Sequence, residues 1–164
     1  MLDHCNQMSN EKNPIKASRR VLIPIEQTPQ CAQTIESYFK TIKKPNDQVI
    51  FVHIIKPKSI NSLMGMRIPN TPALVGTQLQ IDRESLVQAK SLCGDYVRRA
   101  VAHGIQAQGY VYVNSQPSAK LVRLIQSHKA DLVLLMSPER RQSLVDKYVL
   151  KHSPVPLTVV PSHI

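Results

Sequence analysis

Apolar residues follow two patterns along the chain, and the first pattern, short and nearly continuous apolar runs, predicts five strands. Each is a run of five to nine residues rich in valine, isoleucine, leucine or tyrosine. The second run, QVIFVHII, is almost continuously apolar, which suits a parallel strand covered on both faces. Pro24 has no N–H donor for a central ladder, so the first strand should finish there. The five runs are residues 21–25, 48–55, 105–113, 132–136 and 156–160.

The second pattern, in which apolar residues recur every three or four positions, predicts four amphipathic helices between the strands. In the first helix, Thr28 is a suitable N-cap and Pro29 a suitable first residue. In the second, Gly104 is a suitable C-cap, because glycine adopts the left-handed conformation without strain. The fourth should begin directly after its strand, with Ser137 as N-cap and Pro138 as first helical residue. The four segments are residues 28–44, 78–104, 115–130 and 137–153.

Strands and helices alternate strictly, which predicts an α/β fold with a five-stranded parallel sheet, right-handed crossovers and helices on both faces. Ligands of such sheets bind beyond the carboxyl ends of the strands, where the strand order changes direction. The first strand ends at Pro24, Ile25 and Glu26, and the fourth ends at Met136 and Ser137. We therefore expect a candidate site between these ends if the two strands are neighbours.

A single domain over residues 19–164 is expected, because 164 residues suit one hydrophobic core. Residues 1–18 are polar and unpatterned, which indicates a flexible N-terminal tail that contributes little to stability. The connection from Lys56 to Thr77 is long for a compact domain, and its role stays open. No run approaches the ~20 apolar residues of a membrane span. The N-terminus also lacks the apolar core of a secretory signal, so a cytoplasmic location is expected.

The net charge of +10 is spread along the chain. The densest basic groups are only pairs or triplets, such as Lys43 with Lys44 and Arg140 with Arg141. Aromatic residues make up 4% of the chain, too few to suggest stacking platforms for single-stranded nucleic acid. The expected explanation is a solvated basic surface without a nucleic-acid partner. One functional hypothesis that stays open is therefore a protein that binds nucleic acid or other anions through its net positive charge.

Reactive residues form no familiar catalytic or metal-binding pattern. Cys5, Cys31 and Cys93 are odd in number and make no C-x-x-C pair, so neither a disulfide framework nor a zinc site is expected. The spacing of the histidines matches no H-E-x-x-H motif, and His53 is interpreted as a satisfied core residue. Glu26 is the only carboxylate placed like a catalyst, and it has no evident partner. The sequence therefore predicts neither an enzyme nor a metal site.

Four segments resemble the most recognisable parts of the universal stress protein family. They are RRVLIPIE, QVIFVHII, ADLVLLMS and DKYVLKHSPVPLTVVP, and they occur in the family's order between Arg19 and Pro161. The resemblance implies a Rossmann-like sheet with strand order 3-2-1-4-5. It also implies a homodimer through the last strand, from Pro156 to Val160. An apolar edge strand is a liability unless it is paired, which agrees with this expectation.

For many members the resemblance also implies an ATP site, built from a proline-x-aspartate, the residue after a histidine in the second strand, and a G-x2-G-x9-G-[ST] loop. Here Glu26 stands in the aspartate position, and Ser137 stands where the first glycine belongs. Five residues separate Ser137 from Ser143, against twelve in the family pattern, and no glycine follows Gly109. The matching positions are Pro24, Ile25, Glu26, Ile54, Met136, Ser137, Ser143 and Leu144.

We therefore expect a dimeric interaction module of the stress response that does not bind ATP in the family manner. Adenine would still find an apolar pocket near Ile25, Ile54 and Met136, but without a phosphate anchor. The alternative is a remodelled site in which Arg140 or Arg141 holds the phosphates of ATP or AMP. No other cofactor is expected.

Overall fold

Five parallel strands form one sheet in the order β3-β2-β1-β4-β5. The computed structural model describes residues 18–57, 81–137 and 144–161. The strand order, the parallel pairing and the number of strands confirm the predicted fold. The strands are β1 (Arg20–Pro24), β2 (Gln48–Ile55), β3 (Gln106–Val113), β4 (Leu132–Ser137) and β5 (Leu157–Pro161).

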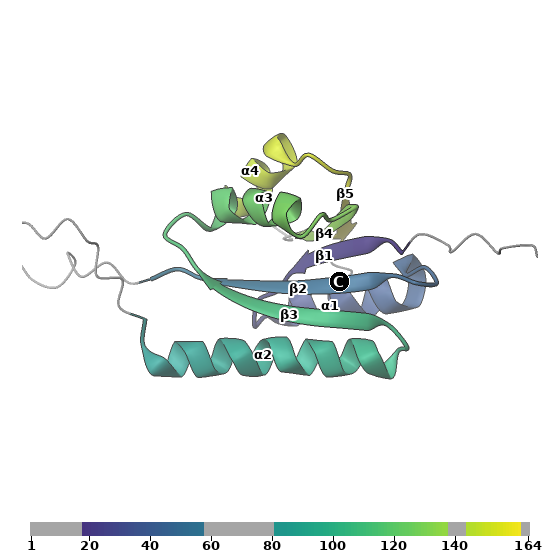
Figure 1. Cartoon of the computed structure of the whole chain (residues 1–164), viewed down its shortest axis with the longest axis horizontal. Helices are drawn as coiled ribbons and strands as arrows, with labels where there is room; N and C mark the ends of the chain where they lie inside the picture. Colours follow the sequence, from purple (N-terminus) through teal and green to yellow (C-terminus); the bar gives the residue numbers. More distant parts are fainter. Residues whose placement is uncertain (1–17, 58–80, 138–143, 162–164) are drawn as a thin grey trace, which may run out of the picture.

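Two helices cover each face of the sheet, with α1 and α2 on one side and α3 and α4 on the other (Figure 1). The first helix continues into a single π-helical turn, η1, which the sequence did not predict. Two of the predicted caps, Thr28 and Gly104, are confirmed. The Thr28 hydroxyl accepts a hydrogen bond from the Cys31 N–H at 3.2 Å, and Gly104 has a φ of +73°. The helices are α1 (Pro29–Ser37), η1 (Tyr38–Ile42), α2 (Arg83–Ala102), α3 (Pro117–Ser127) and α4 (Leu144–His152).

The fourth strand ends one residue later than predicted. Ser137 is the last residue of β4, where it pairs with Pro161. The ladder with β5 therefore extends the strand one residue beyond the predicted end. The described part of α4 begins at Leu144. Outside the described residues lie the predicted onset at Pro138, the N-terminal tail with Cys5, and most of the connection from Lys56 to Thr77.

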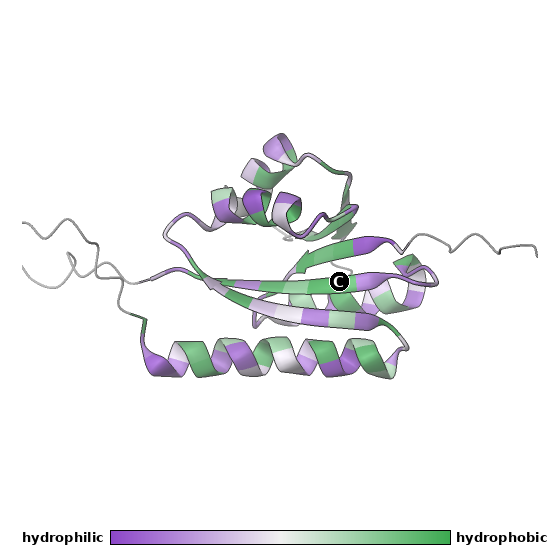
Figure 2. Ribbon diagram, in the orientation of Figure 1, coloured by the Kyte–Doolittle hydropathy of each residue, from purple (hydrophilic) through white to green (hydrophobic). Residues whose placement is uncertain are grey.

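Side chains on the two faces of the sheet form two separate core clusters. On the face of α1 and α2, the cluster is built around Tyr38, Phe51 and Ile35, and Cys31 and Cys93 are buried in it as predicted. The other cluster lies against α3 and α4. Figure 2 shows β1 as mainly hydrophobic, whereas the first half of β3 is more hydrophilic. β1 and β4 thus occupy the centre of the core, and β3 forms an edge with a more polar surface.

A buried carboxylate ties together the end of the sheet where the strands begin. Arg19 donates two hydrogen bonds to Asp47, at 2.9 and 2.6 Å. The Tyr38 hydroxyl and the Lys44 N–H also donate to Asp47, at 2.6 and 2.9 Å. Burial alone would raise the pKa of Asp47, but the hydrogen bonds from Arg19, Tyr38 and the Lys44 amide outweigh it and hold that pKa below its usual value. The segment before β1 and the turn before β2 are therefore fixed to each other.

Candidate functional site

The strand order changes direction between β1 and β4, which are neighbours as the site prediction required. Their register pairs Val21 with Leu132 and Leu22 with Val133. The pairing of β1 with β2 continues further, to Pro24 and Val52. The carboxyl ends of β1 and β4 therefore meet at the topological switch point, where α/β sheets of this kind bind ligands.

Beyond β1 the backbone stays attached to β2. The Ile25 N–H donates to the Val52 carbonyl at 2.8 Å, and Nδ1 of His53 lies 2.8 Å from the Ile25 carbonyl oxygen. A carbonyl only accepts hydrogen bonds, so Nδ1 of His53 carries the proton in this contact. His53 is half-buried and satisfied, which agrees with its interpretation as a structural residue.

The apolar residues of the predicted adenine pocket do not share one face of the sheet. Ile25 and Met136 belong to the cluster beneath α1 and α2, whereas Ile54 packs against the cluster beneath α3 and α4. The reason is the register: Pro24 pairs with Val52, so Ile25 lies beside His53 and one position out of step with Ile54. Because successive side chains of a strand point to opposite faces, Ile54 points away from the side that Ile25 and Met136 share, and a common adenine pocket for the three stays a prediction.

Glu26 follows β1 and is exposed to solvent. Its backbone N–H donates to the Cys31 sulfur at 3.4 Å, and burial raises the pKa of the Cys31 thiol. Within the described residues the Glu26 carboxylate has no hydrogen-bond or ion-pair partner. Glu26 therefore stands at the switch point without a described side chain that would assist it as a general base.

A hollow of about 250 Å³ opens near Ile54, between the end of β2 and the first turns of α2. This volume lies at the low end for a small-molecule pocket. The sequence reasoning missed its polar residues on α2, because α2 begins only after the connection from Lys56 to Thr77 and no local pattern links the two segments. The polar lining residues are Gln27, His53, Lys56, Ser85 and Gln88.

The connection from β4 to α4 is the remaining part of the predicted site. β4 ends at Ser137 and the described part of α4 begins at Leu144; the sequence between them reads Pro, Glu, Arg, Arg, Gln and Ser. The predicted site residue Ser143 and the arginines at 140 and 141 fall outside the described residues. The structure thus places Pro24, Glu26, Met136 and Ser137 near the switch point but does not describe the segment that would meet phosphates.

The described residues form neither a metal centre nor a membrane-spanning helix. Among residues 18–57, 81–137 and 144–161, no group of three or more histidine, cysteine, aspartate or glutamate side chains is arranged to hold a metal ion. No helix in these ranges combines the length and the apolar character that a membrane crossing requires.

Solved structures with the same fold are numerous, although their sequences are distant. A universal stress protein family member from Burkholderia pseudomallei has a TM-score of 0.62 at 14% identity, over 91% of this chain and 100% of that chain. An Arabidopsis thaliana member with AMP bound has a TM-score of 0.58 at 13% identity, over 88% and 92%. An Archaeoglobus fulgidus member in complex with dAMP has a TM-score of 0.62 at 12% identity, over 87% and 97%.

These identities are low enough that the structural likeness shows the fold alone. No curated protein sequence matches the chain. The universal stress protein family model, however, matches residues 17–161, which include every described strand and helix. The chain therefore belongs to the universal stress protein family.

Proposed function

We propose that this universal stress protein is a dimeric interaction module of the stress response whose switch point does not hold ATP in the family manner. The observation that carries the proposal is the short, glycine-free sequence between Ser137, where β4 ends, and Leu144, where the described part of α4 begins. A phosphate nest needs several consecutive N–H groups pointing inward, and glycines let the backbone curl around the phosphates. Six residues without glycine do not supply the G-x2-G-x9-G-[ST] pattern that the family resemblance implies.

The residue types in this connection also oppose phosphate binding. Pro138 has no N–H to donate, and Glu139 adds a negative charge. At an effective dielectric near 20, a like charge about 4 Å from a phosphate costs on the order of 4 kcal/mol before screening. The arginines at positions 140 and 141 offset this only if both side chains turn toward the ligand.

A loop exchange tests whether the connection is the cause. Residues 138–143 are replaced by a segment with the G-x2-G-x9-G-S pattern, and a control of equal length carries alanine at the three glycine positions. We expect the glycine loop to raise ATP affinity at least tenfold, while the alanine control stays at the wild-type level. Equal affinity of both chimeras, at unchanged thermal stability, would show that the connection does not limit nucleotide binding.

The last strand supports the dimeric part of the proposal. Within the described residues β5 pairs only with β4, so its outer edge offers unpaired N–H and C=O groups. Val159 on this strand is 44% exposed. A two-fold copy of the same edge satisfies these groups and covers the apolar side chains.

Sedimentation velocity tests the dimer at micromolar concentration. We expect a dimer for the wild type and a monomer for Val159→Lys, because a charge opposite its own copy opposes pairing. Lys147→Glu, on the exposed side of α4, is the control and should remain dimeric. A wild-type monomer would refute the dimeric part of the proposal.

Binding of an adenine nucleotide at a remodelled site is the alternative function. Two of the similar structures are described as containing AMP or dAMP. In this chain the hollow beside Ile54 contains the cation Lys56 and the amides of Gln27 and Gln88. In this alternative, these groups together with Arg140 and Arg141 bind the nucleotide phosphates in place of the glycine-rich loop.

A further inference from the structure

Two neighbouring hollows, which share two lining residues, open at the amino end of the sheet, opposite the switch point. The first, of about 620 Å³, is lined by Lys43, Lys44 and His103, among others. The second, of about 650 Å³, lies on the face of α3. Both are lined by Gln48 and Gln106, whose amides share a hydrogen bond of 3.3 Å. We call the combined hollow the amino-end groove, and its other principal residues are Arg20, Gln108, Tyr110, His128 and Lys129.

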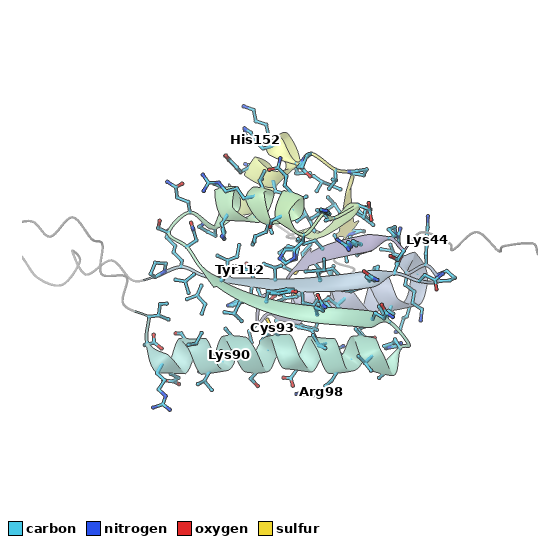
Figure 3. All side chains as sticks on the ribbon, viewed as in Figure 1. Lys44, Lys90, Cys93, Arg98, Tyr112 and His152 are labelled. Carbon is cyan, nitrogen blue, oxygen red and sulfur yellow. The ribbon has the colours of Figure 1, made fainter. Side chains whose placement is uncertain are left out.

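The fold gathers cations in this groove that are scattered in the sequence. Lys43 and Lys44 follow η1, Arg20 opens β1, and Lys129 follows α3; all four are exposed. Figure 3 shows Lys44 at the end of the sheet where β1 and β2 begin. Lys43 donates one hydrogen bond to the His103 carbonyl at 3.2 Å, which leaves its other ammonium protons free for a ligand.

Negative charge is nearly absent from the groove. Asp47 is the only carboxylate among the described residues that line either hollow, and its side chain is 0% exposed in an ion pair with Arg19. Asp131 lies near Arg20 and accepts a hydrogen bond from its N–H at 2.8 Å, but it lines neither hollow. The groove therefore presents an unbalanced positive surface, which attracts an anionic ligand.

The groove also contains aromatic and amide groups between the cations. The rings of Tyr110 and His128 lie with their centroids 4.7 Å apart, and His128 is held by the Tyr112 hydroxyl at 2.8 Å. Burial, and next the charge of Arg20, lower the pKa of His128, so its ring is neutral at pH 7. Gln106 and Gln108 lie exposed on the same face of β3 as Tyr110. Aromatic rings stack on bases, and amides donate to and accept from base edges.

We propose that the amino-end groove binds single-stranded nucleic acid, with phosphates at Arg20, Lys43, Lys44 and Lys129 and a base against Tyr110. The sequence argued against such a partner because its basic pairs are dispersed and its aromatics few. The fold removes both objections by bringing these residues to one surface. A bare phosphate chain would use the cations alone and leave the aromatic and amide groups without a role. A duplex hides its bases from Tyr110.

Fluorescence anisotropy with a labelled single-stranded 12-mer of mixed sequence tests the proposal on the full chain between 50 and 300 mM salt. The groove variant carries Lys43→Gln, Lys44→Gln and Lys129→Asn; asparagine suits the positive φ of position 129. The control carries Lys90→Gln, Lys147→Gln and Lys151→Gln, three exposed lysines on α2 and α4. Both variants lose the same charge, so long-range attraction changes equally.

We expect the groove variant to bind at least tenfold more weakly than wild type at about 100 mM salt. Its salt slope should fall by about 2, since each phosphate contact on a single strand contributes about 0.7. The control should stay within twofold. Equal weakening in both variants would show that only net charge matters, and absence of wild-type binding at 50 mM salt would also refute the groove.

Two further comparisons identify the ligand chemistry. Tyr110→Leu should weaken single-strand binding about tenfold without changing the salt slope, because stacking releases no counterions. A duplex of equal length should bind more weakly than the single strand. If Tyr110→Leu has no effect and inorganic polyphosphate binds as tightly as the oligonucleotide, the groove recognises a phosphate chain and the nucleic-acid proposal is wrong.

Discussion

The two ends of the sheet differ in how their polar groups are satisfied. At the amino end, Asp47 is fully buried and accepts hydrogen bonds from Arg19, Tyr38 and the Lys44 amide. At the carboxyl end, Glu26 is exposed, and the described residues provide it with no partner. The end that the fold makes rigid is therefore not the end where this family is expected to bind its ligand.

The difference has a physical cause in the connections. At the amino end, a short turn between η1 and β2 brings Asp47 against the segment that enters β1. At the carboxyl end, the connection from β1 to α1 leaves the Glu26 side chain exposed to solvent. Four changes would test or sharpen the contrast, beginning with the largest expected effect.

Asp47→Ala should be the most damaging substitution. It removes the acceptor of four hydrogen bonds, leaves the buried Tyr38 hydroxyl without an acceptor, and leaves the part-buried Arg19 with only the Ile42 carbonyl as a partner. Breaking a buried pair in this way costs roughly 3–5 kcal/mol of unfolding free energy, measurable by urea denaturation. Asp95→Ala removes an exposed ion pair with Arg98 and should cost less than about 1 kcal/mol. Similar losses in the two variants would contradict the assigned role of the amino end.

Tyr38→Phe should have an intermediate effect. The substitution keeps the buried ring but deletes the hydroxyl that donates to Asp47 at 2.6 Å. A hydrogen bond to a charged acceptor contributes about 1.5–3 kcal/mol, so we expect a loss in that range. Tyr148→Phe, at a 40% exposed ring on α4, is the matched control and should be nearly neutral. A neutral Tyr38→Phe would place the stability of this end in the Arg19 pair alone.

Acid should remove the contribution of Asp47 to the stability of the chain. The pKa of Asp47 is lower in the folded chain than the usual value near 3.9, so its stabilising contribution is complete above that pH and is lost as pH falls through the folded-state pKa. In Asp47→Asn this protonation is absent, so the pH dependence of the unfolding free energy should be shallower by up to about 1.4 kcal/mol per pH unit between pH 4 and the folded-state pKa of Asp47. Urea midpoints from pH 5 to pH 2 measure it. Parallel profiles for wild type and variant would contradict a lowered pKa.

Glu26→Ala should produce the smallest effect of the four. The side chain is exposed and unpartnered in the described structure, so the free energy of unfolding should change by less than about 0.5 kcal/mol. Thermal melts of the wild type and this variant provide the measurement. A loss above 1 kcal/mol would reveal a partner for Glu26 and remove the contrast with Asp47.

Local patterns predicted the fold because most of its determinants are local. Apolar runs located all five strands, Thr28 and Gly104 marked helix ends, and Pro24 ended β1. Local sequence patterns do not predict contacts between residues far apart in the sequence. Asp47 lies in the short segment between the first predicted helix and the second predicted strand, and nothing in the sequence connects it with Arg19.

The candidate site was predictable only in part, for the same reason. Residue types placed Pro24, Glu26 and Met136 at the ends of the correct neighbouring strands. The register of β1 against β2 decides which side chains share a face, and it separated Ile54 from Ile25. Ser137 became a strand residue because β5 pairs with it, a contact that residues near Ser137 do not reveal.

Isothermal titration calorimetry with ATP and AMP on the wild-type chain tests the central claim most directly. Without a phosphate nest, we expect no dissociation constant below about 100 μM, which corresponds to roughly −5.5 kcal/mol. The double variant Arg140→Ala, Arg141→Ala and its charge-matched control Lys90→Ala, Lys147→Ala should then behave like the wild type. A low-micromolar constant that disappears in the arginine variant but persists in the lysine control would contradict the account and establish the remodelled nucleotide site.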